Sequence, residues 1–136
     1  MKLISTLSVA AVILLLVSLA PALRSAQDTP NHATVTNPVK PTADSQARAK
    51  QIYGIDCAMC HGSDGKGKTD LANEMQLQLK DWTDPATLKD KTDGQLFDFI
   101  RNGTGEGKMP PETAGRAPDD VVWNLVIYIR SFANHP

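Results

Sequence analysis

The chain has 136 residues, with 14 lysines and arginines against 15 aspartates and glutamates, so its net charge at neutral pH is −1. A chain of this length accommodates one domain, and its charge excludes a nucleic-acid binder held by basic side chains. The two cysteines, Cys57 and Cys60, are too close in sequence for a disulfide between them to stabilise a fold appreciably.

The first 22 residues have the layout of an export signal. Lys2 precedes an apolar run from Leu3 to Ala20, and the small residue Ala22 suits a cleavage site. The run also approaches the roughly 20 residues of a membrane-spanning helix. We therefore expect residues 1–22 to be a signal peptide or an N-terminal membrane anchor. Either way the remainder is exported to the periplasm, soluble or tethered to the inner membrane through residues 3–20.

Residues 23–42 contain three prolines and few apolar side chains. This composition predicts a disordered linker, in which His32 is solvated. The remaining residues, 43–136, carry 11 basic against 14 acidic side chains, which gives the predicted domain a net charge of −3. A domain this small often needs a disulfide, a metal or a cofactor to be stable.

Helical patterns run through the domain, and no strand alternation is found. The first predicted helix is capped by Thr42 or Asp44 and continues through Tyr53. The second opens with a capping box, in which the Thr92 and Gln95 side chains each bind the other residue's backbone, and it ends at Gly103. Its apolar stripe consists of Leu96, Phe97 and Ile100.

The last predicted helix has Pro118 in its first turn and acidic residues at its start. Its buried side is predicted to carry Val121, Leu125, Tyr128, Ile129 and Phe132. Long loops over residues 62–91 and 103–117 separate the three helices. Loops of this length are unusual in a bare three-helix bundle, so we expect them to surround something.

The sequence C-A-M-C-H at residues 57–61 allows several kinds of site. A structural zinc site needs four ligands, and only His135 is available to complete it. A thiol-disulfide enzyme carries C-x-x-C at the start of a helix between strands, which are not predicted here. Covalent haem attachment explains the whole motif, because Cys57 and Cys60 can add to the two vinyl groups while His61 ligates the iron.

A second axial ligand is then required, and three methionines and His135 are the candidates. Met59 lies within the motif and cannot reach the opposite haem face, while Met75 is expected to be a packing or surface residue. Met109 follows a glycine-rich stretch and precedes two prolines that stiffen the loop. We therefore predict that His61 and Met109 are the two iron ligands.

The domain resembles the class I c-type cytochromes, particularly small bacterial mono-haem ones, over residues 43–136. The segments CAMCHGSDGKGK, TDGQLFDFIRNGTGEGKMPP and WNLVIYIRSF carry the resemblance. It implies an all-α cytochrome c fold, with three main helices, short helical turns and long loops around one covalently bound haem c. The first and last helices should cross, with Ala49 where glycine is usual and Tyr53 facing Leu125 and Tyr128.

One departure from the family concerns His61. Many relatives have a proline after the histidine whose carbonyl accepts the imidazole proton. Here a carbonyl near Asp70 or Leu71 is expected to serve instead. Trp82 is a candidate donor to a haem propionate, with plain packing as the alternative, whereas Trp123 is expected to be a packing residue.

Histidine and methionine ligation leaves no open iron position, so the predicted protein is an electron carrier and not an enzyme. Its predicted haem pocket is apolar, formed by Tyr53, Leu79, Trp82, Leu96, Phe97 and Ile100. We expect a monomer whose donor is a dehydrogenase or quinol-oxidising complex and whose acceptor is an oxidase or reductase. The alternatives are a fixed haem subunit of a periplasmic dehydrogenase and, with a labile Met109 bond, a ligand sensor or peroxidase. Lys66, Lys68 and Lys108 could form a basic rim for an acidic partner.

Overall fold

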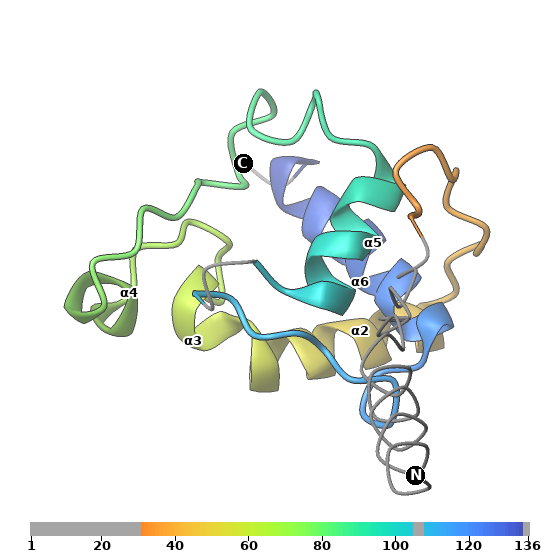
Figure 1. The fold of residues 1–136 in the computed structure, drawn as a ribbon, viewed down its shortest axis with the longest axis horizontal. Helices are drawn as coiled ribbons and strands as arrows, with labels where there is room; N and C mark the ends of the chain where they lie inside the picture. Colours follow the sequence, from red (N-terminus) through yellow and green to blue (C-terminus); the bar gives the residue numbers. More distant parts are fainter. Residues whose placement is uncertain (1–30, 105–107, 135–136) are drawn as a thin grey trace, which may run out of the picture.

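The computed structural model describes residues 31–104 and 108–134, and every regular element in them is a helix. Three longer helices, α2 (Ala43–Asp56), α5 (Asp93–Asn102) and α6 (Asp119–Ser131), are accompanied by the short helices α3 (Ala58–His61), α4 (Asp70–Glu74) and η2 (Phe132–Asn134). Figure 1 shows the long loops that connect them. The predicted all-α class with three main helices is confirmed.

The predicted signal or anchor over residues 1–22 lies outside the described residues, as does His135. Within the part of the chain that the structure describes, no helix combines the length and the apolar character needed to cross a bilayer.

The helix starts follow from short-range capping. Thr42, not Asp44, caps α2: its hydroxyl accepts the N–H of Ser45 at 3.1 Å, and the Ser45 hydroxyl accepts the N–H of Thr42 at 2.9 Å. The capping box of Thr92 and Gln95 is present, with the corresponding distances 3.1 and 3.0 Å. Because each pair lies within one turn, these starts can be predicted from the sequence alone.

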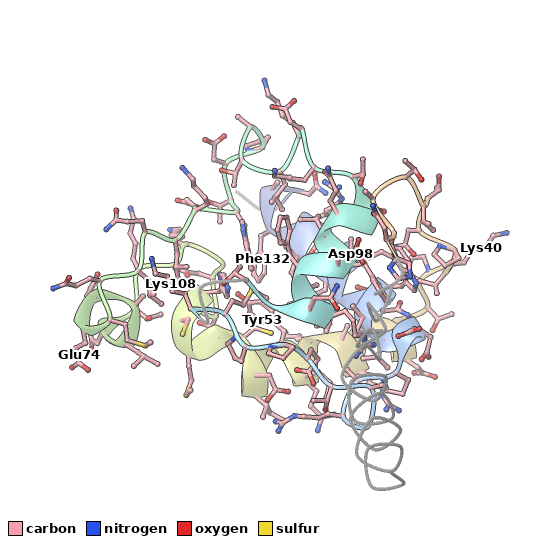
Figure 2. The ribbon with its side chains drawn as sticks, viewed as in Figure 1. Lys40, Tyr53, Glu74, Asp98, Lys108 and Phe132 are labelled. Atoms are coloured by element: carbon pink, nitrogen blue, oxygen red, sulfur yellow. The ribbon has the colours of Figure 1, made fainter. Side chains whose placement is uncertain are left out.

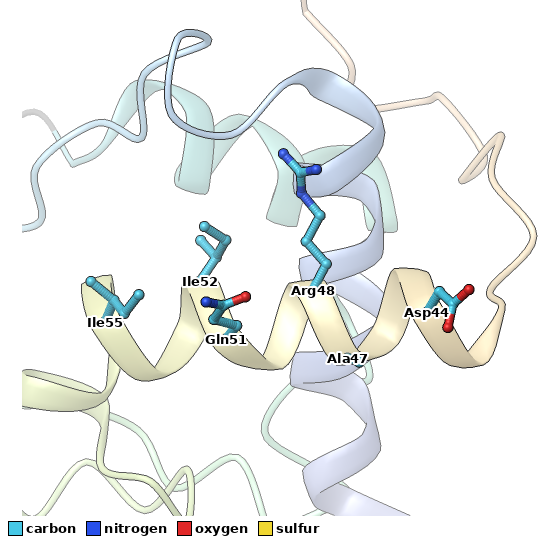
Figure 3. Close-up of a pocket in the computed structure, with 6 residues that line it drawn as sticks. All are labelled: Asp44, Ala47, Arg48, Gln51, Ile52 and Ile55. Atoms are coloured by element: carbon cyan, nitrogen blue, oxygen red, sulfur yellow. The ribbon is translucent and has the colours of Figure 1, made fainter.

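The core forms where α6 runs across α2, as Figure 3 shows. Ala49 is completely buried in this crossing, and the small side chain allows the two helices to approach. The Tyr53 ring packs on the Tyr128 ring with centroids 5.2 Å apart, and Leu125 belongs to the same cluster. The crossing and its predicted partners are confirmed. The buried stripe of α5 joins this core through Leu96, Phe97 and Ile100.

Helix α6 differs from its prediction in two respects. It begins at Asp119, with Pro118 at the N-cap instead of in the first turn. It is also buried on more sides than predicted, because Val122, Trp123 and Val126 are covered as well. Trp123 stacks on Phe97 with ring centroids 4.3 Å apart, so its predicted packing role is confirmed.

The cover over Trp123 comes in part from residues 31–42, here called the N-terminal strap. Its His32 is not solvated: the imidazole Nδ1 lies 2.7 Å from a carboxylate oxygen of Asp98, and its backbone N–H donates to the same carboxylate at 2.9 Å. The ring also packs against Phe97 and Trp123, at centroid distances of 4.5 and 5.9 Å. The prediction of a solvated His32 is therefore wrong, and residues 31–42 make specific contacts with the domain.

The strap lies directly against the first turn of α5. A Cβ atom added to Gly94 would be only 1.6 Å from the carbonyl oxygen of His32, so glycine is required there. Thr92 donates its hydroxyl hydrogen to the carbonyl of Ala33 at 2.6 Å, and the Asn37 amide donates to the carbonyl of Trp123 at 3.0 Å. The proline-rich composition of residues 31–42 does not predict these contacts, because each partner lies far away in the sequence.

Candidate haem-binding site

The three residues of the attachment motif lie on one helical turn. The N–H of Cys57 donates to the Tyr53 carbonyl at 2.9 Å and closes α2. The carbonyl of Cys57 then accepts the N–H groups of Cys60 and His61 at 3.2 and 2.9 Å. The two thiols are not bonded to one another. The structure thus brings Cys57, Cys60 and His61 together as the motif requires.

The environment of Cys57 differs from that of a redox-active cysteine. Burial, reinforced by the carboxylate of Asp56, raises the pKa of the Cys57 thiol to about 12. Thiol-disulfide enzymes instead lower the pKa of the attacking cysteine, so that a thiolate is present at neutral pH. The thiol-exchange interpretation of the motif is therefore disfavoured on chemical grounds.

His61 is held as a neutral imidazole, because burial lowers its pKa. Neutral imidazole is the form that binds a metal. Its Nδ1 atom is buried without a hydrogen-bond partner, so the expected acceptor near Asp70 or Leu71 is not found. The Leu71 carbonyl instead accepts the N–H of Met75 at 3.0 Å, at the end of α4.

The loop after His61 turns sharply through glycines and is fixed by Tyr53. Gly62 has a φ of 79°, a conformation that favours glycine, and its carbonyl accepts the Tyr53 hydroxyl at 2.6 Å. Burial raises the pKa of Tyr53, so the phenol stays protonated and continues to donate. Trp82, from the long loop, stacks on the imidazole of His61 with ring centroids 4.2 Å apart. This loop therefore covers one face of the imidazole with an aromatic ring.

Met109 is half-buried and packs against the same core cluster as Cys57 and Trp82. Its backbone is paired with Thr104: its carbonyl accepts the Thr104 N–H at 3.0 Å, and its N–H donates to the Thr104 hydroxyl at 3.1 Å. Gly103 has a φ of 70°, and a Cβ atom there would lie 2.4 Å from the Met109 carbonyl oxygen. The iron-ligand role of Met109 stays a prediction.

The other methionines of the domain face solvent, since Met59 is 64% and Met75 is 52% exposed. A hollow of about 500 Å³ lies on the outer face of α2 (Figure 3), lined by Asp44, Ala47, Arg48, Gln51, Ile52 and Ile55. It contains no thiol, imidazole or thioether, so it cannot supply haem ligands. Among the described residues, no group of three His, Cys, Asp or Glu side chains is placed to hold a metal ion.

Sequence reasoning missed the arginines around Met109. Arg101, in the last turn of α5, donates to the carbonyls of Glu112 and Ala117 at 2.6 and 2.8 Å. Arg116 pairs with Asp56, the residue directly before Cys57. The partners in the second pair are 60 positions apart, and no local pattern in the sequence signals them.

The side chains present fit a covalently bound haem. Two separate thiols and a neutral imidazole with an unpartnered buried Nδ1 lie on one turn, and a half-buried thioether packs on the same core. Together with the crossed helices, these features define a c-type cytochrome domain.

Comparison with known proteins places the domain more closely. Residues 44–129 match the family described as cytochrome c oxidase, cbb3-type, subunit III, and the chain belongs to this family. It is similar to the cbb3-type cytochrome c oxidase subunit CcoP of Rubrivivax gelatinosus, with 31% identity over 105 residues. The alignment covers 75% of this chain but 32% of that subunit, so the chain spans about a third of the length of its relative.

Proposed function

We propose that this cytochrome c domain carries single electrons through one haem c, attached by Cys57 and Cys60, with His61 and Met109 as axial ligands. The observation that carries the proposal is the single helical turn that holds both thiols and a neutral, half-buried imidazole. Bound haem iron supplies one-electron chemistry by cycling between its ferrous and ferric states.

The residues of the chain have separate tasks in this proposal. The thiols keep the haem attached, and His61 and Met109 fill both axial positions so that oxygen or peroxide finds none open. A thioether ligand also raises the reduction potential relative to a second imidazole. Phe97 and Ile100 belong to the apolar core, and Trp82 stacks on His61, so the site has an apolar side.

We propose a terminal oxidase as the electron acceptor. The similar CcoP protein is named as an oxidase subunit, which favours a haem subunit or haem domain serving an oxidase over one serving a dehydrogenase. On this proposal the domain works on the periplasmic side of the membrane. The proposal also includes that the domain is monomeric and that it is exported.

The first experiment measures attachment. After export from cells that mature c-type cytochromes, the intact mass should exceed that of the polypeptide by one haem, and the Soret absorbance should survive denaturation. The Cys57→Ala/Cys60→Ala variant, made as the control, should lose both signals. A wild-type mass equal to that of the bare polypeptide would refute the proposal.

The second experiment tests the acceptor. Reduced holoprotein should be oxidised by a purified cbb3-type oxidase under air, and the Cys57→Ala/Cys60→Ala protein should give no such turnover. Wild-type protein that carries haem but stays reduced beside an active oxidase would refute the oxidase assignment while leaving the haem assignment intact.

We also propose that exposed lysines guide docking. Lys66, Lys68 and Lys108 are exposed, and Figure 2 shows Lys108 at the α3 side of the molecule, opposite Lys40. Basic residues near the attachment turn would accelerate encounter with an acidic partner surface at low salt. Rates of oxidation by the oxidase should therefore fall as ionic strength rises, and rates independent of salt would exclude the electrostatic contribution.

A further inference from the structure

The segment from Met109 to Ala117, here called the methionine segment, is bound to α5 at Glu112 and at Ala117. The N–H of Glu112 donates to the Ile100 carbonyl at 2.9 Å, and Arg101 binds two carbonyls of the segment. Ala117, at its end, is completely buried. These contacts fix the methionine segment to α5, but none of them reaches the attachment turn.

The attachment turn is reached through Arg116. Its Nε donates to a carboxylate oxygen of Asp56 at 3.0 Å, and its terminal nitrogen binds the second oxygen, so the pair is bidentate. Within the described residues, no other hydrogen bond joins residues 109–117 to α2 or α3. The Asp56 carboxylate is held on a side chain that is only 15% exposed.

The two partners occupy positions that matter for ligation. Asp56 is the last residue of α2, and the next residue, Cys57, is a haem attachment point. Arg116 lies in a short turn, where its N–H donates to the Thr113 carbonyl at 3.1 Å, seven residues after Met109. A bidentate contact restrains both distance and orientation, unlike a single hydrogen bond.

We infer that Arg116 and Asp56 are positioning residues for the axial methionine. Their contact sets the separation between the attachment turn and the methionine segment, and so the strength of the Met109 bond to iron. The inference rests on the proposed function, in which Met109 is the second axial ligand. It assigns no direct contact with haem to either residue.

Imidazole added to the ferric holoprotein measures this positioning, because it must displace Met109 from the iron. The dissociation constant of imidazole should fall about three- to tenfold in Arg116→Gln. This range is that of a strong bidentate contact whose strength is lowered because the arginine is half-exposed to solvent. Asp56→Asn should have a similar effect. The double variant should resemble either single variant, since both changes remove the same contact.

Arg48→Gln is the matched control, because Arg48 is an exposed arginine of α2 and, within the described residues, no hydrogen bond joins it to the methionine segment. It should leave imidazole binding unchanged. Arg116→Lys retains the charge without the planar fork and should fall between wild type and Arg116→Gln. Thermal unfolding of each variant separates a local change in ligation from a general loss of stability.

Two results would overturn the inference: imidazole affinity in Arg116→Gln equal to that in Arg48→Gln, or additive effects of the Arg116 and Asp56 changes. Met109→Ala, measured in parallel, identifies which statement fails. If Met109→Ala also leaves imidazole affinity unchanged, methionine ligation itself is wrong. If Met109→Ala binds imidazole more tightly while Arg116→Gln does not, only the positioning role is wrong.

Discussion

The two sides of the predicted haem site are held in different ways. On the side of His61, the backbone hydrogen bonds of a single helical turn place Cys57, Cys60 and the imidazole, and the Tyr53 hydroxyl fixes the following loop. On the side of Met109, the backbone has no helix, and two long side chains position the loop, Arg101 from α5 and Arg116 from the loop itself. The first side is determined by local sequence, whereas the second depends on tertiary contacts.

This difference implies that the Met109 bond to iron can be lost while the attachment turn with His61 stays intact. Met109→Ala should keep the haem attached through Cys57 and Cys60 but open one axial position. The reduction potential should fall by on the order of 0.1–0.3 V, within the roughly 0.8 V range set by axial ligands. Redox titration and the near-infrared sulfur-to-iron band would show the change.

Met75→Ala is the control for Met109→Ala, because Met75 faces solvent. It should leave both the potential and the band unchanged. Loss of the band in Met75→Ala together with its survival in Met109→Ala would reverse the ligand assignment. Absence of the band from the wild type, together with a potential that neither variant changes, would leave the iron without a methionine ligand and support a sensor or peroxidase.

Replacing the glycine beside the Met109 backbone should weaken the Met109 bond to iron less than replacing Met109 itself. Gly103→Ala forces an alanine to adopt a φ of 70° and places its Cβ 2.4 Å from the Met109 carbonyl oxygen. Holding a residue other than glycine in this backbone conformation alone costs about 1–3 kcal/mol. The sulfur-to-iron band should then disappear at a lower temperature than in the wild type.

Gly115→Ala provides the comparison, since a Cβ atom there meets nothing within 4 Å. Its unfolding free energy should stay within about 0.5 kcal/mol of wild type, as for most surface changes. Equal effects of the two alanine substitutions would show that the close approach of Gly103 to Met109 has no energetic role.

The smallest expected effect is a gain in folding stability from a change in α2, on the His61 side of the site. Gly54 lies inside α2, is exposed, and has open space where a Cβ atom would be. Gly54→Ala should therefore stabilise the fold by about 0.5–1 kcal/mol, measured by denaturant unfolding. The reduction potential should not move, and a changed potential would indicate that the end of α2 adjusts the haem site.

The sequence predicted those parts of the molecule whose partners lie within one helical turn. Thr92 and Gln95 are three residues apart, and the attachment motif spans five, so their geometry follows from helical spacing. The burial of Ala49 and Tyr53 also followed, because the resemblance indicated which helices cross. These features require no knowledge of how the loops are arranged.

The features that were missed depend on long-range contacts between polar side chains. Asp98 meets His32 from 66 positions away, and Arg116 meets Asp56 from 60. Charged residues in loops have the same appearance in sequence whether they are solvated or paired. The acceptor for His61 was wrongly expected for a related reason, since the loop path around Thr69 decides which groups are near.

The N-terminal strap changes where the cooperative unit of the protein begins. A fragment that started at residue 43, near the start of the family match, would lose His32 and leave the Asp98 carboxylate without its imidazole partner. It would also uncover the Trp123 ring, which is 5% exposed in the whole structure. Unfolding measurements on such a fragment would describe a different folding unit, whose boundary excludes an interaction that the intact chain uses to cover its last helix.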